Sequence, residues 1–88
     1  AHLIPDHMVE GVRRYVLRGT PPGDFMRHIL SNDFMAAFGY ADDANQRALF
    51  GWCRFLYSYV PSVCKGSAQA YLDWVAIGGL AGSVSAQP

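Results

Sequence analysis

The sequence has little charge of either sign. Seven basic and seven acidic residues leave the 88-residue chain with no formal net charge, and charged residues make up only 16% of it. Soluble domains usually contain about 25%. A nucleic-acid-binding protein normally has a basic face and a high isoelectric point, and a DNA mimic would be strongly acidic, so both classes are disfavoured. The low charge fits either a compact helical domain or one that keeps apolar surface for a partner or a second copy.

Cysteine and long apolar runs are also scarce. Cys53 and Cys64 are the only cysteines, and the first residues do not resemble a secretory signal. We therefore expect two free thiols in a cytoplasmic protein, although their positions on either side of a helix end leave a disulfide open. No apolar run approaches the ~20 residues that a membrane span needs, so no membrane partner is expected.

Motifs for catalysis and for metal binding are missing as well. No two ligand residues have the spacing of a zinc site, and no glycine-rich phosphate loop is present. The adjacent Asp42 and Asp43 are interpreted as charge at a helix start, since sequence neighbours do not face one another on a helix. Cys53 is expected in the core, and Cys64 beside Lys65 is the more reactive thiol, because a nearby cation lowers a thiol pKa. The sequence therefore predicts no enzyme, cofactor or metal site.

Apolar side chains at helical spacing are what the sequence does contain. Hydrophobic residues make up 51% of it. A helix is predicted from Pro5 to Arg18, because proline suits a first turn and Gly19 suits a left-handed cap. One face of this helix has the spacing of a buried stripe. Its members are Ile4, Met8, Val12, Tyr15 and Val16.

Two short helices are predicted after the break at Pro21 and Pro22. Asp24 is expected to cap the first, which runs to Leu30. Ser31 or Asn32 is expected to cap the second, which ends at Gly39. The longest helix is predicted from residues 41–43 to Tyr59, before Pro61. Its expected core face consists of Asn45, Leu49, Trp52, Cys53, Leu56 and Val60.

Ser67 is expected to cap the last helix, and Gly78 and Gly79 to end it. From residue 80 the chain is small and polar, which predicts a flexible tail over 80–88. The predicted fold is all-α, a compact bundle of four to five short helices around one long central helix, in a single domain over 1–79. Gly11 and Gly51 lie inside predicted helices, where the close approach of another helix would explain them.

The flank of the long helix opposite its core face carries the candidate binding residues. Arg47, Phe50, Arg54 and Tyr57 follow one another there at helical spacing. Arginine and aromatic residues are enriched at the hot spots of protein interfaces. The alternative is a flank that packs on a neighbouring helix while the arginine heads reach water.

A second candidate is the basic cluster of Arg13, Arg14, Arg18 and Arg27. Such a cluster could contact nucleic acid, and in a neutral chain it could equally serve to solubilise a helix.

Several short motifs are spread over the chain from Ile4 to about Leu80. They are Ile4-Pro5-Asp6-His7-Met8, Gly11 with Arg14-Tyr15-Val16, Pro22-Gly23-Asp24-Phe25, Leu30-Ser31-Asn32-Asp33, Ala41-Asp42, Phe55-Leu56-Tyr57 before Pro61-Ser62, and Gly66-Ser67 leading to Trp74. Together they resemble a family of small uncharacterised proteins of bacteriophages, prophages and bacterial genomes. The resemblance implies a phage-associated role and no particular reaction.

We therefore predict a small non-enzymatic interaction protein, phage-encoded, that acts in the host cytoplasm. It would bind and modulate or inhibit a host protein, such as a defence complex, a regulator or a surface-appendage motor. One alternative is a self-associating accessory homodimer that buries the apolar surplus. Another is a small nucleic-acid-binding domain that uses the arginines of the first helix.

Overall fold

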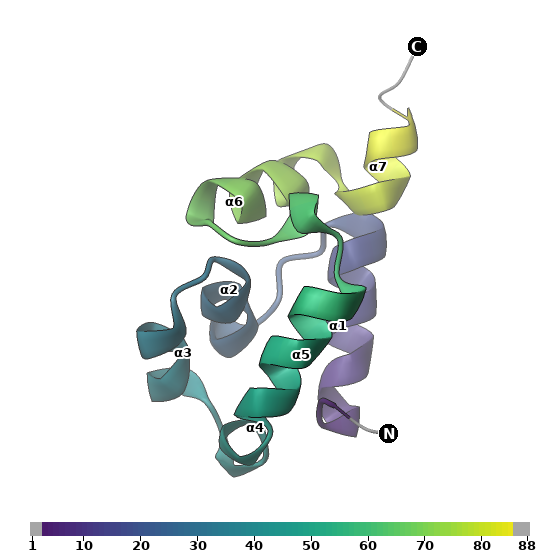
Figure 1. Ribbon diagram of the computed structural model, residues 1–88. Helices are drawn as coiled ribbons and strands as arrows, with labels where there is room; N and C mark the ends of the chain where they lie inside the picture. Colours follow the sequence, from purple (N-terminus) through teal and green to yellow (C-terminus); the bar gives the residue numbers. More distant parts are fainter. Residues whose placement is uncertain (1–2, 86–88) are drawn as a thin grey trace.

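Helices make up most of the chain. The computed structural model describes residues 3–85, which form seven α-helices and one 3₁₀ helix and contain no strand (Figure 1). The all-α prediction is confirmed. The elements are α1 (Asp6–Arg18), α2 (Asp24–Leu30), α3 (Phe34–Tyr40), α4 (Asp43–Arg47), α5 (Leu49–Tyr59), the 3₁₀ helix η1 (Ser62–Cys64), α6 (Ala68–Ile77) and α7 (Gly79–Ser85).

Helix α1 ends at Arg18 as predicted and begins at Asp6, one residue after the predicted start. Pro5 precedes it in an extended conformation, and Gly19 ends it with φ 67°, in the left-handed region. The Gly19 N–H donates to the Tyr15 carbonyl at 2.9 Å, as in helix caps of this type. All five residues of the predicted stripe are buried or pack against the core.

The caps of the next two helices differ from the prediction. Gly23, not Asp24, precedes α2, and Asp24 is its first residue. Asp33, rather than Ser31 or Asn32, caps α3, because its carboxylate accepts a hydrogen bond from the Ala36 N–H. Asn32 instead takes a positive φ of 63°, which makes the turn between the two helices. Helix α3 continues through Gly39 to Tyr40.

The predicted long central helix is wrong, because it is divided into α4 and α5 at Ala48. The side chain of Asn45 accepts a hydrogen bond from the Trp52 indole N–H at 3.0 Å. Positions seven residues apart lie on the same side of a helix, and the long Trp52 side chain joins α5 to α4 across the break at Ala48. The bond gives the buried Asn45 amide oxygen a donor, which it needs away from water.

Trp52 lies at the centre of the core, with no exposed surface. Its ring meets Phe25 of α2 at 5.4 Å and Phe55 of α5 at 6.2 Å, both edge to face. Trp52 and Leu56 are four residues apart on α5 and define its buried line. The prediction that Cys53 lies in the core is wrong, because it is exposed. One residue beyond Trp52, its side chain is turned by about 100° from that line.

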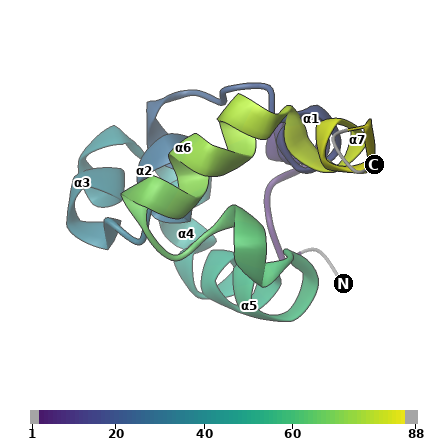
Figure 2. The ribbon, with the colours of Figure 1, turned by 90° about the horizontal axis from the view of Figure 1, so that it is seen from above.

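The last helices close the structure on α1. Ser67 caps α6 as predicted, accepting from the Ala70 N–H at 3.0 Å, and Gly78 ends it with φ 82°. The flexible tail predicted from residue 80 is wrong for 80–85, since α7 packs there on α1 (Figures 1 and 2). Residues 86–88 lie outside the described chain. Helix α7 thus continues past residue 79, where the predicted domain ends.

Glycine makes the contact between α1 and α7 possible. A side chain on Gly19 would meet the backbone of Gly78 and Gly79, and one on Gly79 would meet the backbone of Arg18 and Gly19. Both glycines also have a φ of 67°, which favours glycine. The backbones of α1 and α7 are therefore in contact at Gly19 and Gly79, where a side chain on either glycine would separate them.

Candidate protein-interaction surface

The predicted binding residues form an exposed strip, here named the α5 stripe: Arg47, Phe50, Arg54 and Tyr57. Arg47 ends α4, and the other three lie on α5, on the side away from Trp52. Phe50 is 78% exposed and Tyr57 is 87% exposed. Both arginines are exposed as well. In residues 3–85 no neighbouring helix covers these side chains, so the alternative of a packed flank does not describe this surface.

An apolar groove lies beside the α5 stripe and shares Arg54 with it. This α1–α5 groove is open and has a volume of about 920 Å³. Residues of both helices, α1 and α5, line it, and α5 lies in front of α1 in Figure 1. The apolar side chains that line it along these helices are Val9, Val12, Val16, Leu17, Phe55 and Tyr59.

The chain before α1 determines how the groove forms. This segment crosses from α5 to the start of α1 (Figure 2), and the Leu3 and Ile4 that line one end of the groove belong to it. The Leu3 backbone lies so close to Gly51 that any side chain there would collide with it. A close approach at Gly51 was predicted from another helix, whereas the segment that approaches it is the non-helical chain before α1. At Gly11 a methyl group would lie 3.7 Å from the Met26 sulfur, which is an ordinary contact distance.

The charge around the groove is uneven. Arg13 of α1 and Arg54 of α5 line opposite walls, with Asp6 at one end. Neither arginine has a carboxylate partner among residues 3–85. Helix α1 contains three arginines and two acids, and α5 contains one arginine and no acid. The two helices therefore carry a formal charge of +2 in a chain whose net charge is zero.

The predicted basic cluster is only partly a cluster of free charges. Arg13, Arg14 and Arg18 are exposed on α1. Arg14 lies 3.6 Å from Glu10, one turn earlier. Arg27 is on α2 and donates to Asp24 at 3.1 Å. Two of the four arginines are thus paired with acids on their own helices.

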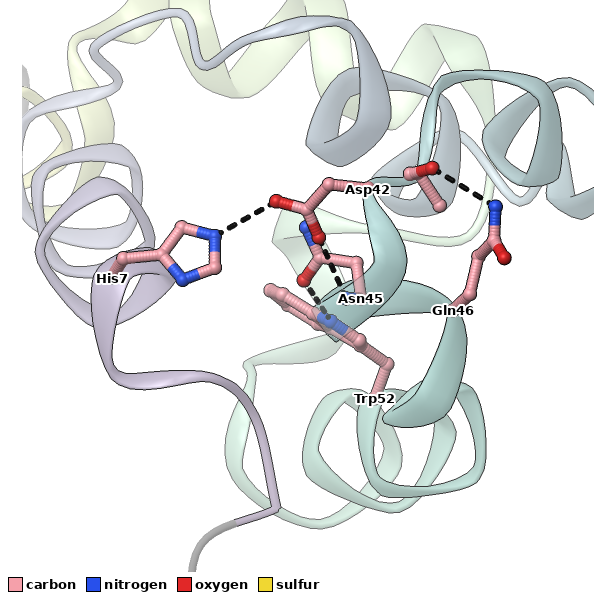
Figure 3. Close-up of polar contacts among 6 residues, drawn as sticks. His7, Asp42, Asn45, Gln46 and Trp52 are labelled. Carbon is pink, nitrogen blue, oxygen red and sulfur yellow. Dashed lines mark hydrogen bonds and ion pairs between the residues drawn. The ribbon is translucent and has the colours of Figure 1, made fainter.

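A polar network joins α1 to α4 and α5 (Figure 3). His7 lies 3.1 Å from one oxygen of Asp42, whose other oxygen accepts from the Asn45 N–H at 2.8 Å. Asn45 in turn accepts from Trp52. The Asn45 N–H, and then the His7 ring, lower the pKa of the Asp42 carboxyl. Asp42 therefore caps α4, as its place in the sequence predicts.

The His7–Asp42 pair does not have the surroundings of a catalytic dyad. It borders a shallow hollow of about 340 Å³. No serine, threonine or cysteine is among the described residues that line this hollow. A histidine–carboxylate pair activates a nucleophile only within hydrogen-bond reach of it. The pair instead connects the start of α1 to the start of α4.

The two cysteines have exchanged their predicted environments. Cys64 is fully buried, and burial raises its pKa to about 11 although Lys65 acts in the opposite direction. The Lys65 ammonium group donates to the carbonyls of Leu56 and Val60, at the end of α5. The predicted reactivity of Cys64 is therefore wrong, because its cation stabilises a helix end. Both cysteines are free.

Residues 3–85 bring no three histidine, cysteine or acidic side chains together as metal ligands. Over the same residues, no helix has both the length and the apolar character needed to cross a membrane.

The sequence prediction missed the groove. The feature of the sequence that indicates the groove is the wide apolar face of α1. Val9 and Leu17 lie beside the residues that face the core and widen this apolar face. Val9 is 49% exposed and Tyr59 on the facing wall is 70% exposed. An apolar arc wider than one packed face indicates surface left for another molecule.

Comparison of the chain with protein-family models, with curated protein sequences and with solved structures gave no match. The physical character of the α5 stripe and of the groove is therefore what supports a function.

Proposed function

We propose that this chain is a non-enzymatic interaction protein that binds a host protein through the α5 stripe and modulates or inhibits it. Its resemblance to small phage and prophage proteins supports a phage origin and action in the host cytoplasm. The observation that carries the proposal is the exposure of Phe50 and Tyr57 on α5, together with Arg54 on the same helix and Arg47 at the end of α4.

The chemistry of the stripe favours a partner of a different kind over a second copy. Burying a large apolar side chain contributes about 1.5–3 kcal/mol, so two exposed rings offer considerable binding energy. Arginines beside such rings are typical of hot spots. Helix α5 has no acidic residue, so two copies of the stripe would bring like charges together. A partner with acidic residues would meet them favourably.

The test is capture of partners from a bacterial host lysate, followed by binding measurements with the purified partner. The double variant Arg54→Ala/Tyr57→Ala should lose the interaction. Leu72→Ala, on α6, is the control, because Leu72 is also exposed and apolar but lies outside the stripe and outside α3. If the double variant binds every captured partner as tightly as the wild type does, the proposed surface is wrong.

A homodimer through α3 is the second candidate. Met35 is 85% exposed and Phe38 is half exposed, and α3 itself carries no charged residue. Such a face can pair with its own copy without charge repulsion. Light scattering over a range of concentrations tests this candidate, since a mass that stays monomeric removes it.

A further inference from the structure

We infer that the α1–α5 groove is a binding site for an amphipathic α-helix whose polar face is acidic. This site is additional to the α5 stripe and rests on different residues, apart from the shared Arg54. It is a site for a helical segment of a protein partner.

The groove exposes apolar surface on which the apolar face of a helix can bind. Val9 of α1 and Tyr59 of α5 both line it, and both are largely accessible to solvent. Val12 and Phe55 lie deeper and are buried or half-buried. The groove therefore has a graded apolar floor on which large side chains of a partner can be buried.

The length of the groove fits a helix. Its lining on α1 runs from Asp6 to Leu17, which corresponds to about 16 Å, or three helical turns. An amphipathic helix places its anchor residues one turn apart along such a length. Small-molecule sites enclose most of the ligand surface, whereas this groove is open along its side. Leu3 and Ile4 close only one end of it.

The positive charge on the groove walls favours a helix whose polar face carries acidic residues. Arg13 and Arg54 lie on opposite walls, and neither is paired with a carboxylate in the described chain. Arginine binds carboxylates with two parallel hydrogen bonds, so glutamate or aspartate beside the anchors would contact both walls. A basic helix would be repelled by the same groups.

A second copy of this chain does not supply such a helix. Helices α1 to α7 each carry at most one acidic residue in excess of their basic residues. The described chain therefore offers no strongly acidic amphipathic helix of its own. Charge complementarity indicates a different protein as the source of the segment.

The experiment uses three fluorescein-labelled helical peptides of about 15 residues, long enough to cover the groove. The first has leucine anchors on one face and glutamate on the other, the second has lysine in place of glutamate, and the third is a scrambled form of the first. Fluorescence anisotropy should show that the glutamate peptide binds at least about tenfold more tightly than the lysine peptide, as expected for matched and opposed charges. The scrambled peptide should not bind.

Two variants locate the binding. Val9→Asp should abolish binding of the glutamate peptide, while Leu72→Asp, which places the same charge on an exposed position of α6, should leave it unchanged. Arg13→Glu should reverse the preference between the glutamate and lysine peptides. Circular dichroism confirms that each variant is folded.

Several results would overturn the inference: equal binding of the glutamate and lysine peptides, binding of the scrambled peptide, or a preference unchanged by Arg13→Glu. Stronger binding to phosphatidylglycerol vesicles than to the glutamate peptide would assign the groove to a lipid surface instead. Self-association lost in Val9→Asp would assign it to a second copy.

The double variant Phe50→Ala/Tyr57→Ala separates the two proposals, because it removes the rings of the α5 stripe and leaves the groove intact. It should bind the glutamate peptide like the wild type even where it has lost a host partner.

Discussion

The hydroxyl of Tyr15 donates a hydrogen bond of 2.6 Å to the backbone carbonyl of Cys64, from α1 to the end of η1. Tyr15 is fully buried, and its ring stacks on that of Tyr71 in α6 at 5.6 Å. Burial raises the pKa of Tyr15, so the hydroxyl keeps its proton and remains a donor. One side chain thus joins three parts of the chain.

Removal of this hydroxyl should therefore destabilise the fold. Tyr15→Phe leaves the Cys64 carbonyl buried without its donor, which costs about 1–3 kcal/mol of unfolding free energy. Urea denaturation followed by circular dichroism measures the loss. Tyr57→Phe is the control, since the exposed Tyr57 should give no change. Equal stability of Tyr15→Phe and wild type would mean that the bond contributes nothing.

The two thiols should differ in reactivity. Cys53 is exposed, whereas Cys64 is buried and has a raised pKa of about 11. The thiolate is the reactive form. Cys64 should therefore react slowly for two reasons: the reagent cannot reach the buried sulfur, and at neutral pH the thiol stays protonated. Iodoacetamide at neutral pH should label one cysteine in the folded protein and two in denaturant. Mass spectrometry after digestion identifies which one, and early labelling of Cys64 would contradict its buried position.

The stability of the α4 start should depend on acid pH. The folded state lowers the pKa of Asp42 below its usual value of 3.8, through the Asn45 N–H and then His7. The folded state therefore holds fewer protons at this group than the unfolded state. The stabilisation is complete above pH 3.8 and is lost as the pH falls through the lower folded pKa.

Thermal melts between neutral pH and acid pH test this for Asp42. Asp42→Asn keeps an acceptor at the cap but cannot titrate, so the difference in melting temperature between wild type and variant should shrink as the pH falls. A difference that stays constant across the pH range would exclude a contribution from the carboxylate charge.

Gly51 should be intolerant of any side chain. Gly51→Ala places a methyl group against the Leu3 backbone, so the segment before α1 has to move. We expect a loss of roughly 1–3 kcal/mol, typical of overpacking, although alanine favours helix by about 1 kcal/mol over glycine. Gly39→Ala is the matched control, since open space surrounds Gly39 on α3. It should be neutral or slightly stabilising. A stabilising Gly51→Ala would disprove the close approach.

Local signals predicted the helices that have strong ends. Pro5 and Gly19 bracket α1, and Ser67 and Gly78 bracket α6, because capping chemistry is encoded within a few residues. The α5 stripe was also predicted as a set of residues on one flank. Periodicity alone gives the side of a helix on which a residue lies.

Contacts between distant residues explain what was missed. The break at Ala48 lies between Asn45 and Trp52, whose side chains are joined by a hydrogen bond that no local pattern reports. Helix α7 has little apolar periodicity and depends on its backbone contact with α1 at Gly19. The α1–α5 groove depends on the spacing between two helices, which the Leu3 backbone against Gly51 determines.

The packing of α7 on α1 also determines the order in which the protein can fold. During synthesis, α1 leaves the ribosome first, yet the indole of Trp74 reaches the Tyr15 carbonyl across 59 positions of sequence. A helix of 13 residues is marginal alone in water, so α1 remains largely unformed until α6 and α7 are made. The adjacent α2 and α3 can pair early, because their contacts are local. The position of α1 therefore depends on contacts with the segments that are made last, α6 and α7.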